Sequence, residues 1–192
     1  MLTSLKQFGI DKNYFEIKKI GDFSNASKEG FDHIKTEAID FDKTKEKVCN
    51  ELKQEGYKSC DALDIIDSKN RINFIEFKQL ENRENIIDWI ENLDLPLKIK
   101  DSRDILYNIV RSRDFVYRDK KKKILSCEKN IIISFSLSNK NSIIKFVSLL
   151  RLAYVEEKII SHIKQNYIEG EQFNAPICMK IEDFDKKYLQ YK

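Results

Sequence analysis

Glycine and proline are scarce in this chain, with 5 Gly and 2 Pro among 192 residues. A phosphate-binding loop of the P-loop type needs several closely spaced glycines, and flexible linkers between domains are also rich in such residues. We therefore exclude nucleotide hydrolysis of the P-loop type. We expect a single domain over residues 1–192, long enough to bury its own core.

Cysteine and histidine are also few, with 4 Cys and 2 His. The cysteines stand far apart and form no CxxC pair, so the pattern disfavours a tetrahedral zinc site. Isolated thiols are typical of a reducing compartment, and we expect free cysteines in a cytoplasmic protein. The scarcity of histidine disfavours nuclease chemistry centred on that residue.

The chain has no long apolar run and no strong excess of either charge. Its most apolar stretch, residues 146–155, is interrupted by Arg151, and the amino terminus has no continuous apolar segment. We expect no membrane association. Lys+Arg 35 against Asp+Glu 32 gives a net charge of +3, so a polyanionic partner would have to be bound by a local cluster of basic residues.

The first half of the chain contains signals for both strands and helices. Residues 14–20 are expected to form a strand and residues 26–36 a short helix. Asp42 suits the N-cap of a helix that carries Val48, Leu52 and Glu55 on one face and ends near Gly56.

In the second half, residues 81–93 have helical spacing, and Pro96 is expected to mark a break before a helix over residues 102–117. Residues 130–137 are β-branched and apolar and predict a buried strand, and residues 177–181 predict an edge strand followed by a short helix. This order predicts an α/β fold with a mixed sheet flanked by helices.

Residues 59–80 read as two apolar strands joined by a polar turn, with Asp61 on the first strand and Glu76 and Lys78 on the second. Side chains alternate across a strand, so Glu76 and Lys78 share one face. A two-residue turn at Lys69 and Asn70 would pair Asp61 with Lys78 and Leu63 with Glu76. Asp61 and Glu76 would then be diagonal neighbours, with Cβ atoms about 7–8 Å apart.

Apolar residues occupy both faces of this hairpin, as is typical of a sheet covered by helices on each side. On the face of the acids we expect Leu63, Ile65, Ile72 and Phe74, and on the other face Ala62, Ile66, Ile75 and Phe77. Ionisable groups buried there would cost several kcal/mol unless paired. Two carboxylates can bind a divalent cation such as Mg²⁺ or Mn²⁺, with Lys78 orienting a water or stabilising a phosphorane.

Two alternatives remain open for these acids. A structural salt bridge within the hairpin would also satisfy Glu76 and Lys78. Asp64 could replace Asp61 as the first acid, but in a regular strand it lies on the opposite face unless a β-bulge turns it around.

An acid, then a (D/E)-x-K triplet on the next strand, then a helix resembles the PD-(D/E)XK nuclease superfamily. The resemblance covers residues 42–93, and residues 130–137 would complete a restriction endonuclease-like core over about 42–137. It implies that Asp61 and Glu76 are metal ligands, Lys78 is the catalytic lysine and Gln79 is an adjacent polar site residue. Family members often add an acid from the preceding helix, for which Glu51 and Glu55 are the candidates. One departure is that only residues 56–60 separate that helix from the acidic strand, where the family usually has another strand.

This resemblance implies a metal-dependent nuclease that hydrolyses phosphodiester bonds in DNA, in a setting such as restriction or phage defence. The alternative is a catalytically silent subunit that binds nucleic acid or assembles with a partner. A third reading is an unrelated α/β protein without a polyanionic partner.

The densest basic segment is a second candidate for contact with nucleic acid. A solvated helix end explains the same residues equally well. They are Arg111, Arg113, Arg118, Lys120, Lys121, Lys122 and Lys123. A predicted long helix over residues 142–166 offers an aliphatic face for a homodimer or a larger protein partner.

Overall fold

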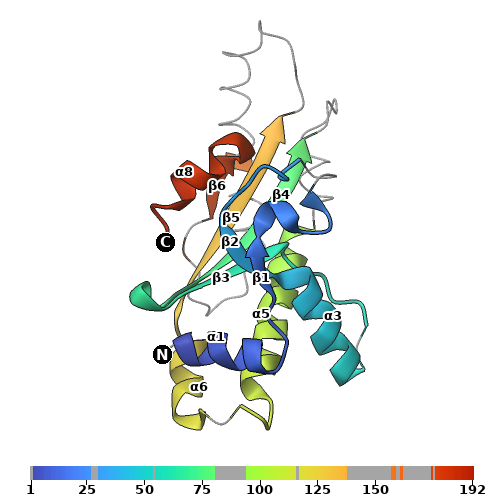
Figure 1. The fold of residues 1–192 in the computed structure, drawn as a ribbon, viewed down its shortest axis with the longest axis vertical. Coiled ribbons are helices and arrows are strands. Elements are labelled where there is room, and N and C mark those ends of the chain that lie inside the picture. The colour runs from blue at the N-terminus through green and yellow to red at the C-terminus, as the bar shows by residue number, and fades with distance from the viewer. Residues whose placement is uncertain are drawn as a thin grey trace, which may run out of the picture.

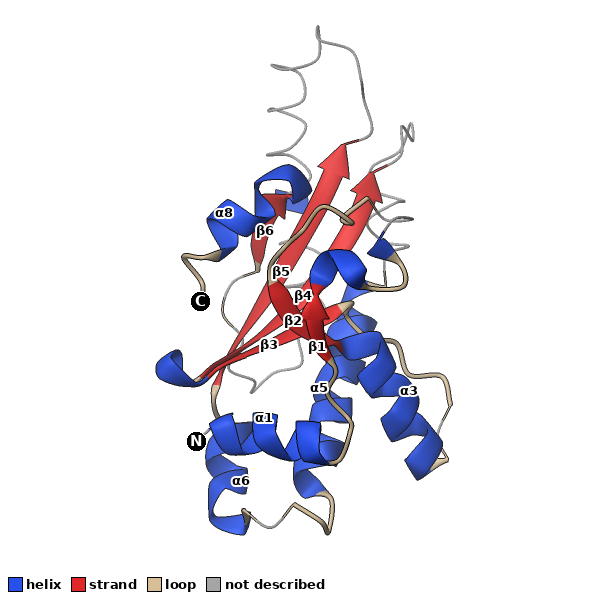
Figure 2. Cartoon of the chain, viewed as in Figure 1, coloured by secondary structure: helices blue, strands red, loops and turns tan. Residues whose placement is uncertain are grey.

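The computed structural model describes residues 2–26, 30–53, 55–80, 94–115, 117–137, 157–158, 161, 174 and 176–192. A mixed six-stranded sheet with the order β1-β2-β3-β4-β5-β6 forms its centre (Figures 1 and 2). Neighbouring strands are antiparallel from β1 to β4 and parallel from β4 to β6. The strands are β1 (Ile17–Lys19), β2 (Glu37–Asp40), β3 (Ala62–Ile66), β4 (Arg71–Leu80), β5 (Glu128–Leu137) and β6 (Ile177–Lys180).

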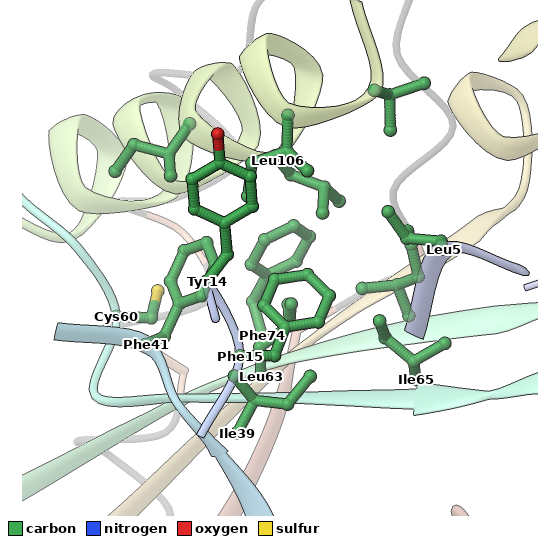
Figure 3. Packing of buried hydrophobic residues seen from close by; sticks show 14 of the residues in the cluster. Leu5, Tyr14, Phe15, Ile39, Phe41, Cys60, Leu63, Ile65, Phe74 and Leu106 are labelled. Carbon is green, nitrogen blue, oxygen red and sulfur yellow. The ribbon is translucent and has the colours of Figure 1, made fainter. Parts of the chain in front are cut away.

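Within the described residues, four helices pack on one face of the sheet and enclose the first core cluster. They are α1 (Leu2–Asp11), α3 (Phe41–Leu52), α5 (Leu95–Arg111) and α6 (Arg118–Leu125). Figure 3 shows Leu63, Ile65 and Phe74 of the sheet in the same cluster as side chains from these helices, such as Leu5 and Leu106. The predicted α/β class with a mixed sheet is thereby confirmed.

The opposite face carries the second core cluster, which joins the two ends of the chain. It contains Ala62, Ile75 and Phe77 of the sheet together with the C-terminal elements and five residues nearer the N-terminus, Ile20, Phe23, Ala26, Phe31 and Ile34. The N-terminal residues of this cluster begin in the short 3-10 helix η1 (Ile20–Asp22). The C-terminal elements are the 3-10 helix η4 (Ile181–Asp183) and the helix α8 (Phe184–Tyr188). The predicted division of apolar residues between the two faces of the hairpin is therefore confirmed for seven of its eight positions, Ile66 being buried but in neither cluster.

The register of the hairpin is shifted by two residues from the expected one. Leu63 pairs with Phe74 and Ala62 with Ile75, so the expected pairs Leu63–Glu76 and Asp61–Lys78 are wrong. The turn is longer than expected because a 3-10 turn, η2 (Asp67–Lys69), is followed by Asn70 in the left-handed region at φ 50°. Asparagine tolerates this conformation well. A shift by an even number leaves every side chain on its expected face, since strand side chains have a period of two.

The first long helix starts earlier than expected. Asp40, and not Asp42, is the N-cap of α3, and its side chain accepts a hydrogen bond from the backbone N–H of Lys43. The helix ends at Leu52, whose side chain is exposed, and Lys53 adopts the left-handed cap conformation. The predicted extension toward Gly56 is wrong.

Pro96 lies inside the first turn of α5 and does not precede a later helix. Proline is tolerated there because the N–H groups of the first turn have no partner within the helix. The expected range of 102–117 is therefore wrong at both ends, since α5 begins at Leu95 and ends at Arg111. This correction brings Lys98 into the first turns of the helix.

The remaining expectations have mixed outcomes. The strands at residues 130–137 and 177–181 and the final short helix are confirmed, whereas residues 30–36 are turns and irregular backbone in place of the expected helix. Residues 81–93 lie outside the described residues, as does nearly all of the predicted dimer helix over 142–166. In the described part of the chain, no helix combines the length and the apolar character needed to cross a bilayer.

Candidate metal centre

Helix α5 holds the chain segment that leads into Asp61. The backbone N–H of Lys58 donates to Oδ2 of Asp101 at 2.9 Å, and that of Cys60 donates to the buried hydroxyl of Ser102 at 2.8 Å. Both acceptors are buried. These side-chain hydrogen bonds replace strand pairing in an irregular segment, and they fix where β3 begins.

Asp61 is the residue before β3, and its carboxyl group is bound from two sides. Its Oδ2 accepts a hydrogen bond from the backbone N–H of Phe77 at 2.6 Å, and its Oδ1 accepts one from Nδ2 of Asn25 at 3.2 Å. Only 4% of Asp61 is exposed. Because Phe77 follows Glu76, the first bond brings the Asp61 carboxyl beside the acid of β4.

Glu76 is 1% exposed, and both of its ionic contacts reach the same oxygen. Its Oε1 lies 2.8 Å from Nζ of Lys78 on β4 and 2.6 Å from Nζ of Lys98 on α5. Its Oε2 is buried and has no hydrogen-bond partner within the described residues. A buried carboxylate oxygen without a partner is rare, and it marks a position where a further ligand would be stabilised.

The local electrostatics favour the neutral form of Asp61. Burial raises its pKa, and the charge of Glu76 raises it further, to about 8, although Lys98 and Lys78 act in the opposite direction. For Lys98, burial acts to lower the pKa, but the charges of Glu76 and Asp61 outweigh it, so the pKa is raised. Glu76 is thus paired with two lysines, and the raised pKa of Asp61 favours its protonated form.

Asp64 is turned away from this group of residues. It lies on the opposite face, where its Oδ2 accepts a hydrogen bond from the hydroxyl of Tyr188 at 2.9 Å. That hydroxyl accepts one from Nδ2 of Asn73 at 2.9 Å. Asp61, and not Asp64, is therefore the acid beside Glu76, and the β-bulge alternative is wrong.

The two acids suggested for the preceding helix do not reach Asp61 and Glu76. The start of α3 lies next to Asp61, since Phe41 N–H donates to its carbonyl oxygen at 3.1 Å. Glu51 lies ten residues further along, about 15 Å at the rise of an α-helix, and it accepts a hydrogen bond from Tyr14. Glu55 is exposed beyond the helix. No group of three or more His, Cys, Asp or Glu side chains forms a metal cluster among the residues described.

The basic segment lies at the far end of α5 from these acids. Lys98 is near the start of that helix and Arg111 is its last residue, a separation of about 20 Å along its axis. Exposed side chains there include Arg113, Lys122 and Lys123, whereas Lys120 and Lys121 are half-buried. Arg118 is the first residue of α6. Gln79, the predicted polar site residue, follows Lys78 in β4.

Sequence reasoning missed two residues that contact the acids. Lys98 was missed because its helix was expected to start after it, although its position close behind Pro96 in a first turn was a usable signal. Asn25 lies in an irregular segment where no periodic pattern indicates what its side chain contacts.

Comparison of the chain with protein-family models, with curated proteins and with solved structures found no match.

Proposed function

We propose that this protein is a metal-dependent nuclease that hydrolyses phosphodiester bonds in DNA, with Mg²⁺ or Mn²⁺ held by Asp61 and Glu76. The observation that carries the proposal is that Oε2 of Glu76 is buried and has no hydrogen-bond partner within the described residues, while the Asp61 carboxyl is bound to the N–H of the next residue, Phe77. Mg²⁺ is often bound by only one or two carboxylates, with waters and substrate phosphate as the remaining ligands, so the absence of a third acid is compatible with it. A cation bound there would neutralise phosphate charge and lower the pKa of a water molecule.

The two lysines are more exposed than the two acids of the site, so a phosphate can reach them. The Lys78 and Lys98 side chains are 17% and 19% exposed, whereas Glu76 is 1% exposed. An ammonium group donates charge-assisted hydrogen bonds to phosphate oxygens. We therefore assign Lys78, as the resemblance implies, and also Lys98 to holding the scissile phosphate and stabilising the charge that develops on it.

The chain order adds support through its resemblance to the restriction endonuclease-like core of PD-(D/E)XK nucleases. An acidic strand, the strand with the E-x-K triplet, a helix and a parallel strand follow one another as β3, β4, α5 and β5. The strand beside β3 is β2, which precedes α3, and this order departs from the family pattern. A role in restriction or phage defence is part of the same proposal and rests on this resemblance alone.

A test is the nicking of supercoiled plasmid DNA in Mn²⁺ by the wild type and by Lys78→Ala. We expect the wild type to nick, chelation of the metal to abolish nicking, and Lys78→Ala to lower the rate by about 100-fold or more. Lys69→Ala, at the exposed turn of the same hairpin, is the matched control and should retain the rate. A wild type that nicks neither DNA nor RNA in Mn²⁺ or Mg²⁺ would contradict the proposal.

A silent nucleic-acid-binding subunit is the second candidate. It is favoured by the exposed basic side chains of Arg111, Arg113, Lys122 and Lys123 and by the pairing of Glu76 with two lysines. In the plasmid experiment this candidate predicts no nicking but a salt-sensitive shift of DNA in a gel. Replacing Lys122 and Lys123 by alanine should then weaken the shift and reduce its salt dependence.

A further inference from the structure

Asn25 contacts Asp61 from a part of the chain that the hairpin motif does not include. Its Nδ2 donates to Oδ1 of Asp61 at 3.2 Å, while the backbone N–H of Phe77 occupies Oδ2. The Asp61 carboxyl is thus oriented by one donor on each oxygen. Each oxygen of an ionised carboxylate has two lone pairs, so each keeps one for a cation.

The segment that carries Asn25 is packed firmly. Its neighbours Phe23 and Ala26 are buried in the second core cluster, and further along the segment the ring of Phe31 stacks on that of Phe77 with centroids 4.3 Å apart. Phe77 is the residue whose N–H binds Asp61. Phe77 of β4 is therefore linked to this segment in two ways, to Phe31 through ring packing and to Asn25 through the Asp61 carboxyl.

The C-terminal helix fixes the far end of this segment. Asp185 accepts hydrogen bonds from the backbone N–H groups of Lys35 and Thr36 at 3.0 and 2.9 Å, and from the Thr36 hydroxyl at 2.7 Å. Three hydrogen bonds to one carboxylate restrict where the segment can move. The residues on either side of Asn25 are held by packing, and residues 35 and 36 by hydrogen bonds, and neither depends on the carboxyl that Asn25 contacts.

We infer that Asn25 is a positioning residue of the candidate metal centre, which holds the Asp61 carboxyl in the rotamer that binds a divalent cation. This inference rests on the proposed function for its role, and on the geometry of Asn25, Asp61 and Phe77 for its structural part. Asn25 acts as a hydrogen-bond donor to a ligand and is not itself a ligand. Residues that orient metal ligands in this way commonly affect metal affinity by about 10- to 100-fold.

Two measurements on Asn25→Ala test the inference. The first is the hydrogen-exchange rate of the Phe77 amide in metal-free protein, which reports whether the Asp61 carboxyl stays on that N–H. The second is the Kd for Mn²⁺ by titration. We expect amide exchange about tenfold faster and a Kd at least about tenfold higher than in the wild type. Ser24→Ala, one residue away and exposed, is the control and should change neither value.

Asn25→Asp separates positioning from ligation because aspartate keeps the shape of asparagine but loses the donor. We expect it to resemble Asn25→Ala in both measurements, and a tighter Mn²⁺ affinity than the wild type would overturn the inference. Unchanged Phe77 exchange in Asn25→Ala would overturn it as well. If the wild type binds no Mn²⁺ while Phe77 exchange responds to Asn25→Ala, the metal-dependent function fails and the positioning of Asp61 by Asn25 stands.

Discussion

Nζ of Lys98 lies 2.6 Å from Oε1 of Glu76, although 22 positions separate the two residues along the chain. This contact joins the first turns of α5 to the middle of β4, and it places a second ammonium group on a carboxylate that already contacts Lys78. Glu76 is 1% exposed, so these two ammonium groups, and not solvent, surround Oε1 of its carboxylate.

Replacing Lys98 by methionine should destabilise the fold. Methionine keeps most of the apolar stem but removes one of the two charges that neutralise a buried carboxylate, and Lys78 remains as a partner. We expect a loss of about 2 kcal/mol in the free energy of unfolding, measured by urea denaturation. Lys100→Met, two residues along the same helix and largely exposed, should cost at most about 0.5 kcal/mol. Equal effects from the two substitutions would show that the contact with Glu76 adds no stability.

The raised pKa of Asp61 predicts a pH dependence of stability. Burial and the charge of Glu76 raise the pKa from the ordinary 3.8 to about 8 in the folded protein. The folded state therefore binds a proton that the unfolded state releases, and this contribution is fully present below about pH 4 and is lost as the pH rises toward 8.

The measurement is urea unfolding of the wild type and Asp61→Asn between pH 5 and 8. The wild type should lose stability relative to the variant as the pH rises, with a slope of up to about 1.4 kcal/mol per pH unit. Asparagine removes the titration while retaining the size of the side chain. Parallel pH profiles for the two proteins would refute the assignment of a protonated Asp61.

The hydroxyl of Tyr188 anchors α8 to the opposite face of the sheet. It donates to Asp64 and accepts from Asn73, and all three residues are buried. Tyr188→Phe leaves both partners without this contact, and we expect a loss of about 1–3 kcal/mol in the free energy of unfolding. Tyr191→Phe is the matched control near the end of the chain, and it should change that free energy by less than about 0.5 kcal/mol. A neutral Tyr188→Phe would mean that the hydroxyl does not contribute to holding α8 on the sheet.

Periodicity predicted the faces of the hairpin, the strand at residues 130–137 and the edge strand, because burial on a sheet depends mainly on alternation and apolar content. The register was wrong, because it depends on the loop, and nothing local distinguished a two-residue turn from η2 followed by Asn70. Since the error was an even number of residues, Asp61 and Glu76 were still predicted on one face.

Contacts between distant segments could not be predicted in the same way. Lys98 and Asn25 reach the acids from a helix start and from an irregular segment, and their positions depend on tertiary packing. The additional acids Glu51 and Glu55 were expected from a family pattern, but α3 carries Glu51 away from Asp61 along its length, and Glu55 is exposed beyond the end of that helix.

The most direct test of the central claim is the anomalous diffraction of Mn²⁺-soaked crystals. The account predicts a peak within coordination distance of Oε2 of Glu76 and of the Asp61 carboxyl, and no such peak in crystals of Glu76→Gln. The account is contradicted if wild-type crystals at millimolar Mn²⁺ give no anomalous peak there and Lys78 and Lys98 still contact Glu76.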